Sequence, residues 1–290
     1  MQFYYTRSGI QMLLKSGPVF AFRALKYVLL KKLGATQVMS IFVCPSHVCN
    51  ANCVHCYEKY SASKNHTLST KEVKEIIDQF AGLGGLIVRF CSGEFLLRKD
   101  CYELVDYVTR KHMYCTITTN GLLLDEPTVD GLIRAGLKEL IVSLDSANPE
   151  RHDSMRGVKG CFERATNGIR IAASKGLTTL IWTYVSKSNY DELDAIARLG
   201  KELGAKYTYV FFTLLSGHYF DRHEENLTVK EREEFRRRFN GREDIRLEFP
   251  TEQDECTGGG KYHVCVMPSG DKGKCPVSGM CPMRFLAHVT

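Results

Sequence analysis

Apolar and polar positions follow two alternating patterns through the middle of the chain. Short apolar runs such as VMSIFVC and ELIVSLD have the length and composition of buried strands, whereas segments such as STKEVKEIIDQFAGLG repeat apolar residues every three or four positions, as helices do. Six strand–helix pairs can be counted between residues 38 and 240. The alternation predicts an α/β fold in which helices cover a parallel sheet.

The number of units limits the architecture. Six are too few for a closed eight-stranded barrel, so we expect either a partial (β/α)6 barrel of the TIM type or a doubly wound sheet, with the site at the carboxyl ends of the strands. Helix starts are marked by a capping residue followed three positions later by Glu, at Ser69 with Glu72, Asn189 with Glu192, and Thr228 with Glu231.

Residues 1–37 form a basic amphipathic segment ahead of the predicted core, which spans residues 38–240. Within residues 19–33, an apolar stripe flanked by lysines consists of Phe22, Leu25, Leu29 and Leu33. The pattern predicts a helix that either lies across the main domain or contacts a membrane surface or a lipid substrate. Basic residues interrupt this segment and no export signal opens the chain, so we expect no membrane span. We expect a cytoplasmic protein, with residues 19–33 as the candidate for peripheral contact with the inner membrane surface.

The overall charge excludes some classes of partner. Lys and Arg number 39 against 33 Asp and Glu, a formal net charge of +6. Six basic residues precede the first acidic residue, Glu58, and the remainder of the chain is close to neutral. Nucleic-acid binding needs a broader basic surface, so we expect no nucleic-acid partner. Twelve cysteines are many for a chain without an export signal, which makes bound metal a better explanation than disulfides.

Three of these cysteines are closely spaced in the loop after the first predicted strand. Cys49, Cys53 and Cys56 form a C-x3-C-x2-C motif at the mouth where the site is expected. Structural zinc needs four ligands, and a fourth is missing locally unless His47 or His55 supplies it. A [4Fe-4S] cluster held by only three cysteines would instead leave one iron open for another ligand.

The motif, its position and the six-unit core resemble the radical S-adenosylmethionine (radical SAM) superfamily over roughly residues 40–240. The resemblance implies a [4Fe-4S] cluster on Cys49, Cys53 and Cys56 whose open iron binds SAM. Reductive cleavage of SAM then yields a 5'-deoxyadenosyl radical that removes a hydrogen atom from a substrate. A flavodoxin or ferredoxin is the kind of reductant that the family uses.

The same resemblance assigns residues around SAM. Ser92-Gly93-Glu94-Phe95 stands where the family has a Gly-Gly-Glu-Pro motif for the amino group of SAM, with the first Gly and the Pro replaced. TTNG ends the third strand, and VSLDSANPERHDSMRG resembles the fourth-strand motif of relatives with a C-terminal extension. The assigned residues are Ser92, Gly93, Glu94, Thr118, Asn120, Ser143, Asp145, Arg156 and Tyr57. Many relatives place an aromatic residue before the third cysteine to contact the adenine. Here His55 stands at that position and Tyr57 follows the cysteine, so the resemblance leaves open which side chain packs on the adenine. An Arg156 side chain with its charge in water is the alternative for that residue.

Residues 241–290 are predicted to form a separate small module that is rich in Gly and Cys. Cys256 is followed by thirteen residues, Gly270, four residues and Cys275, which resembles the start of a SPASM or twitch module with an auxiliary iron-sulfur cluster. A β-hairpin over YHVCVMPSGDKGK would join the two thiols, and Cys281 lies within reach of the same centre. Cys265 is either the fourth ligand or a core residue, and a zinc knuckle is the alternative for the whole module.

No motif in the sequence identifies the substrate. Relatives with this extension favour a peptide or protein, and a membrane lipid or a small-molecule cofactor precursor is the alternative. A non-catalytic iron-sulfur or zinc protein that serves as electron carrier or scaffold is the alternative of another class. The other cysteines are expected in the core, and three aromatic residues are core residues that could also line a substrate cavity. These two sets are Cys44, Cys91, Cys101, Cys115 and Cys161, and Tyr184, Tyr209 and Phe211.

Overall fold

A computed structural model describes six stretches of the chain. They are residues 7–34, 38–56, 67–91, 93–212, 223–247 and 263–266, and for residues 7–16, 31, 223 and 263–266 the backbone alone is described. No helix in these stretches is long and apolar enough to cross a membrane.

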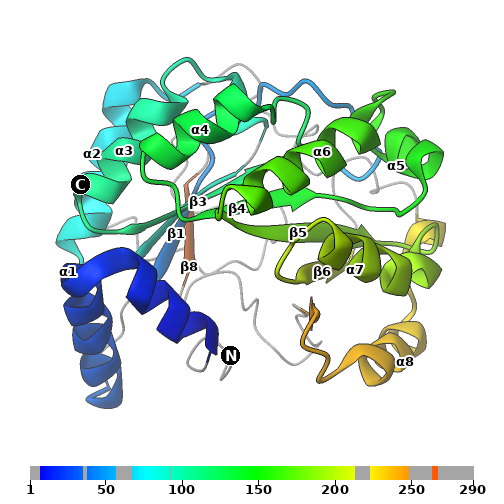
Figure 1. Cartoon of the computed structure of the whole chain (residues 1–290). Coiled ribbons are helices and arrows are strands. Elements are labelled where there is room, and N and C mark those ends of the chain that lie inside the picture. The colour runs from blue at the N-terminus through cyan, green and yellow to red at the C-terminus, as the bar shows by residue number, and fades with distance from the viewer. Residues whose placement is uncertain are drawn as a thin grey trace.

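The described strands form one curled parallel sheet (Figure 1). Its spatial order is β7-β6-β5-β4-β3-β2-β1-β8, and every neighbouring pair is parallel. The strands are β1 (Ser40–Val43), β2 (Ile87–Phe90), β3 (Tyr114–Thr119), β4 (Glu139–Ser143), β5 (Thr178–Val185), β6 (Thr208–Phe212), β7 (Ile245–Leu247) and β8 (His263–Val266). The order of β1 to β6 follows the chain without the reversal that defines a doubly wound sheet. The predicted partial barrel is therefore confirmed.

Helices connect successive strands, as the alternating pattern predicts. Figure 1 shows α2, α3, α4 and α6 on one face of the sheet and α8 beside its β7 edge. The helices are α1 (Arg7–Lys32), α2 (Thr70–Gly82), α3 (Cys101–Arg110), α4 (Glu126–Arg134), α5 (Pro149–Arg156), α6 (Cys161–Ser174), α7 (Leu193–Glu202) and α8 (Val229–Phe239), with short 3-10 turns η3 (Phe95–Leu97), η4 (Tyr190–Glu192) and η6 (His223–Glu225).

The two faces of the sheet carry different side chains because alternate residues of a strand point to opposite sides. On β5, Ile181 joins the large core between the sheet and the helices. Its neighbour Trp182 belongs to a second cluster on the other face, together with Tyr209 and Phe211 of β6. The inner face of the barrel is thus lined by aromatic residues.

Two strands lie beyond the predicted core. β7 pairs with β6, and β8 pairs with β1, so residues after 240 extend the same sheet at both edges. Cys265 lies in β8 opposite Phe42 of β1. The second strand of the predicted hairpin lies outside the described residues, so the hairpin and the boundary at residue 240 stay predictions.

Two of the three predicted helix caps are confirmed. Ser69 and Thr228 each accept a hydrogen bond from the backbone of the third helical residue, and the glutamate there accepts one in return. The prediction for Asn189 is wrong, because no side-chain cap forms at η4. The Asn189 amide instead donates to the carbonyl oxygens of Asp145 and Tyr184, both at 2.7 Å.

The N-terminal helix α1 contacts the core through a different face from the predicted stripe. It is kinked at Gly17 (φ 79°), and its second half packs Phe20 and Tyr27 against Leu86, Ile87 and Tyr114. Because these partners precede or begin β2 and β3, α1 covers the amino ends of the strands. All four residues of the predicted stripe are exposed.

Candidate active site

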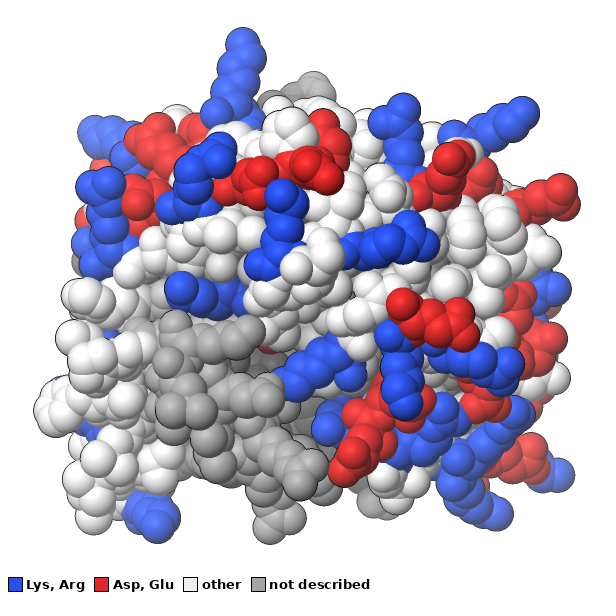
Figure 2. Space-filling view, in the orientation of Figure 1, with Lys and Arg blue, Asp and Glu red and all other residues white. Residues whose placement is uncertain are grey.

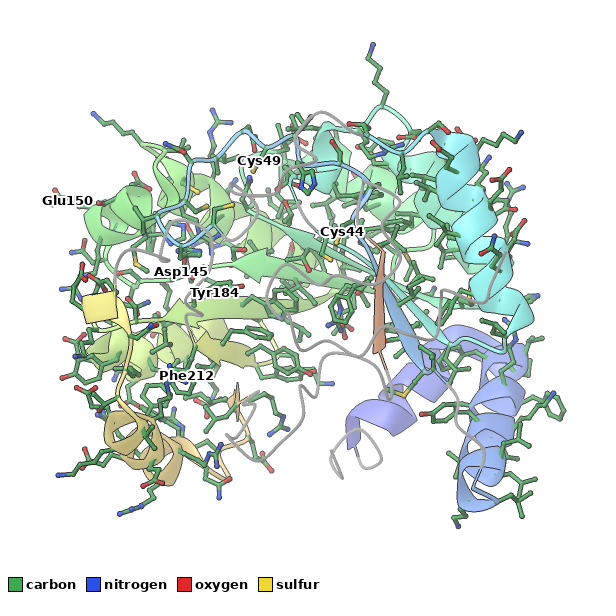
Figure 3. All side chains as sticks on the ribbon, turned by 180° about the vertical axis from the view of Figure 1, so that it is seen from behind. Cys44, Cys49, Asp145, Glu150, Tyr184 and Phe212 are labelled. Atoms are coloured by element: carbon green, nitrogen blue, oxygen red, sulfur yellow. The ribbon has the colours of Figure 1, made fainter. Side chains whose placement is uncertain are left out.

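The three-thiol loop runs from the carboxyl end of β1 across the top of the sheet (Figure 3). Cys49 is exposed, whereas Cys53 and Cys56 are half-buried, and none of the three is in a disulfide. The loop is held by the end of α5, because the Asn52 amide donates to the Arg156 carbonyl at 3.0 Å and the Val54 amide to the Met155 carbonyl at 2.9 Å. The backbone thus fixes the loop without using the thiols.

Two glycines allow other segments to approach this loop. At Gly93 (φ 56°), an added Cβ would lie 2.5 Å from the Val48 carbonyl oxygen. At Gly157 (φ 65°), it would lie 2.4 Å from the Asn52 carbonyl oxygen. Both positions combine a left-handed backbone with contact against backbone atoms, which cannot move aside as a flexible side chain can. The loop therefore requires glycine on both sides.

Glu94 lies beneath the loop and joins it to β3. Its backbone amide donates to the Val48 carbonyl at 2.8 Å. Its buried carboxylate accepts hydrogen bonds from the Leu96 amide at 3.1 Å, the Thr119 hydroxyl at 2.9 Å and the Asn120 amide at 2.8 Å. Burial raises the pKa of Glu94, and the three donors offset only part of that effect. This carboxylate thus sets the position of the loop relative to the end of β3.

Asn120 and Thr118 represent the TTNG motif at the end of β3. The Asn120 amide nitrogen donates to Asn50 Oδ1 at 2.7 Å and lies 3.8 Å from Cys49 Sγ. The hydroxyl oxygen of Thr118 is buried and has no hydrogen-bond partner among the described residues. A buried hydroxyl without a partner is costly, so it is a natural contact for a bound ligand.

Arg156 and Asp145 form a buried ion pair next to Cys53. Arg156 Nη2 lies 2.7 Å from Asp145 Oδ2, and Nη1 lies 3.7 Å from Cys53 Sγ. Burial alone would raise the pKa of Asp145, but the charge of Arg156, together with those of His55 and His152 when they are protonated, outweighs it and lowers that pKa. The alternative of an Arg156 charge in water is wrong, because this side chain is buried.

The other groups around Asp145 fix its carboxylate in place. The Tyr184 amide donates to Oδ1 at 2.9 Å, and His55 Nε2 lies 3.6 Å from Oδ2. The His55 ring stacks on the Tyr184 ring with centroids 4.6 Å apart. Behind them, the Asp145 amide donates to His152 Nδ1 at 3.1 Å, and burial lowers the pKa of His152 to about 4. His152 is therefore a neutral acceptor at neutral pH.

Several predicted residues fall at this site and others lie outside the described stretches. Ser143 is buried at the end of β4, and Thr118 lies in β3 with a buried hydroxyl. Contacts to the loop after β1 are made by Gly93, Glu94, Asn120, Asp145 and Arg156. Ser92, Tyr57, Cys256, Cys275 and Cys281 lie outside the described residues. All five cysteines predicted for the core are buried, as are Tyr209 and, in part, Tyr184 and Phe211.

The described residues do not gather three metal-binding side chains around one point. A cubane cluster does not need such convergence, because each thiolate binds a different iron. Three thiolates are the donor set of such a cluster with one iron left open, whereas a structural zinc ion needs four ligands that meet at one centre.

Two supporting residues were not predicted in these roles from the sequence: Asn189 supports the loop after β4, and His152 accepts from the Asp145 amide. Thr119, which donates to Glu94, lies in the TTNG motif that the sequence had already singled out at the end of the third strand. His152 lies seven residues after Asp145, and nothing in that spacing distinguishes it from an exposed helical histidine.

Comparison with known proteins identifies the family. The model of the Radical SAM superfamily matches residues 43–246. AdoMet-dependent heme synthase of Methanosarcina barkeri is 40% identical over 170 residues, which are 58% of this chain and 49% of that protein. Mycofactocin maturase MftC of Mycolicibacterium smegmatis is 34% identical over 161 residues, 55% of this chain and 41% of that protein. The chain spans about half the length of the curated relatives it matches.

Solved structures agree at the level of the fold. Streptococcus suis SuiB bound to its precursor peptide SuiA superposes with a TM-score of 0.66 at 17% identity, covering 86% of this chain and 62% of SuiB. At that identity the likeness concerns the fold alone. The family model, in contrast, spans the thiol loop, both glycines and the Asp145–Arg156 pair. This chain belongs to the radical SAM superfamily of enzymes.

Proposed function

We propose that the chain holds a [4Fe-4S] cluster on Cys49, Cys53 and Cys56, binds SAM beside it and removes a hydrogen atom from a substrate. The family implies the cluster and SAM. The observation that supports this use of the site is the thiol loop, which is fixed by backbone hydrogen bonds and bordered by the buried guanidinium of Arg156. These backbone bonds hold the segment that carries Cys53 in a fixed position.

The side chains around the loop have the chemistry that SAM needs. SAM carries an ammonium and a carboxylate, and when bound to the reduced cluster it supplies a carbon radical for hydrogen abstraction. The Glu94 carboxylate accepts three hydrogen bonds of about four that a carboxylate can accept, which leaves one position for an ammonium. Arg156 Nε and the Thr118 hydroxyl, buried and unpartnered among the described residues, can donate to a carboxylate.

The surrounding residues keep these donors and acceptors in place. Asp145 holds the Arg156 guanidinium at 2.7 Å, and the neutral His152 ring fixes the backbone of Asp145. His55 and Tyr184 form a stacked pair beside the same carboxylate. A flat ring system such as adenine can pack on such a pair. Preorganisation of this kind excludes water from a reactive species and limits side reactions.

For the substrate we propose a peptide or protein. The support is the similarity to mycofactocin maturase and to the subtilosin biosynthesis protein AlbA of Bacillus subtilis, which is 32% identical over 163 residues. Because those matches cover 41% and 36% of the relatives, they concern the shared core and leave the substrate to be tested.

A second candidate is a small-molecule precursor of the tetrapyrrole type. It is favoured by the 40% identity to a heme synthase and by a buried arginine among aromatic rings on the inner face of the barrel. There the Arg89 guanidinium lies 5.1 Å from the Phe42 ring centre and 5.5 Å from that of Trp182. A buried cation among aromatic rings suits a flat, carboxylate-bearing molecule.

We also propose that residues 241–290 carry an auxiliary iron-sulfur cluster on Cys256, Cys275 and Cys281, with Cys265 as the fourth ligand. The support is the spacing of these cysteines. Anaerobically reconstituted protein should then contain about eight irons per chain. Replacement of Cys256 and Cys275 by Ala should lower that number to about four, and a wild-type content of about four would contradict the proposal.

The proposed activity is tested by product release. Reconstituted protein incubated with dithionite and SAM should form 5'-deoxyadenosine, and the Cys53→Ala variant should not. A Cys101→Ala variant is the matched control, because Cys101 is a buried cysteine at the start of α3 and far in sequence from the loop. An electron carrier or scaffold would give no 5'-deoxyadenosine with any variant. Addition of candidate peptides or porphyrins should raise the yield for the correct substrate class.

A further inference from the structure

The exposed face of α1 is unusual for a helix that belongs to a globular core. Its large apolar residues are 57% to 74% exposed, compared with 2% for Phe20 and 3% for Tyr27 on the opposite face. The exposed residues are Phe22 (69%), Leu25 (67%), Leu29 (57%) and Leu33 (74%). At 100° per residue these four lie within one stripe of the helix, so they form a continuous apolar surface.

The orientation of that stripe is fixed by the body of the protein. Arg23 Nη1 donates to the Lys111 carbonyl at 2.7 Å and Nη2 to the Ala81 carbonyl at 3.3 Å. The Phe20 ring packs against Tyr114 with centroids 6.2 Å apart. These contacts hold the opposite side of the helix against α2, α3 and the sheet. The helix cannot rotate to bury its stripe without breaking them.

The charges next to the stripe indicate which kind of partner the stripe can bind. Lys26 and Lys32 are exposed and flank the stripe on its two sides, and neither forms an ion pair with a described residue. No acidic residue occurs in α1 or anywhere before Glu58. On the face shown in Figure 2, the lower left region, where α1 lies in Figure 1, shows white and blue atoms, whereas red and blue are mixed elsewhere.

We propose that the stripe of α1 docks on an anionic lipid bilayer, with the helix axis in the plane of the headgroups. A helix that inserts an apolar face while lysines at its borders meet acidic headgroups is the usual form of such contact. The absence of a membrane-spanning helix among the described residues agrees with surface attachment. A protein partner would need an apolar face with acidic residues at its borders to bind the same stripe and its lysines.

The position of α1 also determines how the docked enzyme faces the membrane. α1 covers the amino ends of β2 and β3, whereas the thiol loop follows the carboxyl end of β1, which is parallel to them. Figure 3 shows Cys49 near the upper edge of the molecule and α1 at the lower edge. The site would therefore face away from the bilayer. Docking through α1 attaches the enzyme to a membrane and does not feed a lipid chain directly into the site.

The test is binding of the full chain to extruded vesicles, measured by co-sedimentation. Wild type should bind vesicles of phosphatidylcholine with 30% phosphatidylglycerol, should bind pure phosphatidylcholine at least tenfold less, and should dissociate as salt rises. The Leu25→Asp/Leu29→Asp variant should lose binding at least tenfold. Lys26→Gln/Lys32→Gln should lose roughly fivefold per lysine.

A matched control uses exposed apolar residues on other helices. Leu83 is 55% exposed at the end of α2 and Val229 is 54% exposed at the start of α8. The Leu83→Asp/Val229→Asp variant should bind like wild type. Unchanged circular dichroism and melting temperature of every variant would show that folding is intact. Failure of the wild type to bind anionic vesicles, or normal binding by the Leu25→Asp/Leu29→Asp variant, would overturn the proposal. Loss of self-association in the stripe variant, without any vesicle binding, would identify a second copy of the chain as the occupant.

Discussion

The buried pair of Asp145 and Arg156 provides the sharpest test of the site's electrostatics. The two side chains meet at 2.7 Å and are 0% and 7% exposed. Replacing Asp145 by Asn keeps an oxygen for the Tyr184 amide but leaves the Arg156 charge buried without a counter-ion. Removal of one partner of such a pair costs about 3–5 kcal/mol in the free energy of unfolding. For a chain of this size, that loss corresponds to a melting temperature lower by at least about 6 °C.

An exposed pair of almost the same length is the control. Arg110 Nε lies 2.8 Å from Asp106 Oδ2 on the surface of α3, and these side chains are 78% and 39% exposed. Because water screens this pair, Asp106→Asn should change the free energy of unfolding by no more than about 0.5 kcal/mol. The two pairs have nearly the same distance and differ in burial, so the comparison isolates the effect of burial on the free energy of unfolding. Similar losses in the two variants, measured by urea unfolding of the metal-free protein, would show that burial does not set the strength of the Asp145–Arg156 pair.

The same pair makes a prediction about pH. The pKa of Asp145 is lowered in the folded protein by Arg156 and the two histidines, against the opposing effect of burial. Its stabilisation is therefore complete above the ordinary carboxyl pKa of about 3.9 and is lost as pH falls through the folded value. The difference in stability between wild type and Asp145→Asn should be constant near neutral pH and should shrink below about pH 4. A difference that does not depend on pH would contradict this assignment.

Two further predictions concern the residues that support the loop. Gly157→Ala should destabilise the protein by about 1–3 kcal/mol more than Gly160→Ala, and it should lower iron retention. Both glycines have positive φ, but only at Gly157 would an added Cβ meet backbone, at 2.4 Å from the Asn52 carbonyl oxygen. Equal melting temperatures of the two variants would argue against this close approach. His152 has a pKa of about 4 in place of 6.5, so the unfolded state takes up its proton first and stability should fall as pH drops from about 6.5 to about 4. His152→Gln should lose that part of the pH dependence in urea titrations, and an unchanged profile would show that His152 is not buried and neutral.

The sequence predicted the core of the fold because its signals are local. Six runs of strand type and the glycine-bounded helices specify the parallel sheet β1 to β6, and the thiol spacing marks the loop after β1. The signal for β7 is weaker, since it is only three residues long and gains its stability from pairing with β6. Pairings such as β8 with β1 join residues more than 200 positions apart, which no local pattern encodes.

The wrong cap at Asn189 and the choice left open for α1 have the same physical origin. Asn189 has the right residue type and spacing for a helix cap, but its amide finds better partners in the carbonyl groups of Asp145 and Tyr184. In α1, both faces carry large apolar residues, so periodicity could not tell which one meets the core. Phe20 and Tyr27 are buried because Tyr114 and Ile87 lie opposite them. In both cases, contacts with residues far away in the sequence selected one of two structures that the local sequence allows equally well.

In the proposed function, Cys49, Cys53 and Cys56 hold a redox-active cluster with one iron left for SAM. The most direct measurement is electron paramagnetic resonance of the anaerobically reconstituted, dithionite-reduced protein, with Cys256 and Cys275 replaced by Ala so that only the loop is observed. We predict a reduced iron-sulfur signal that changes shape when SAM is added and disappears in Cys49→Ala. A silent protein that contains zinc, or a signal that SAM leaves unaltered, would contradict the account.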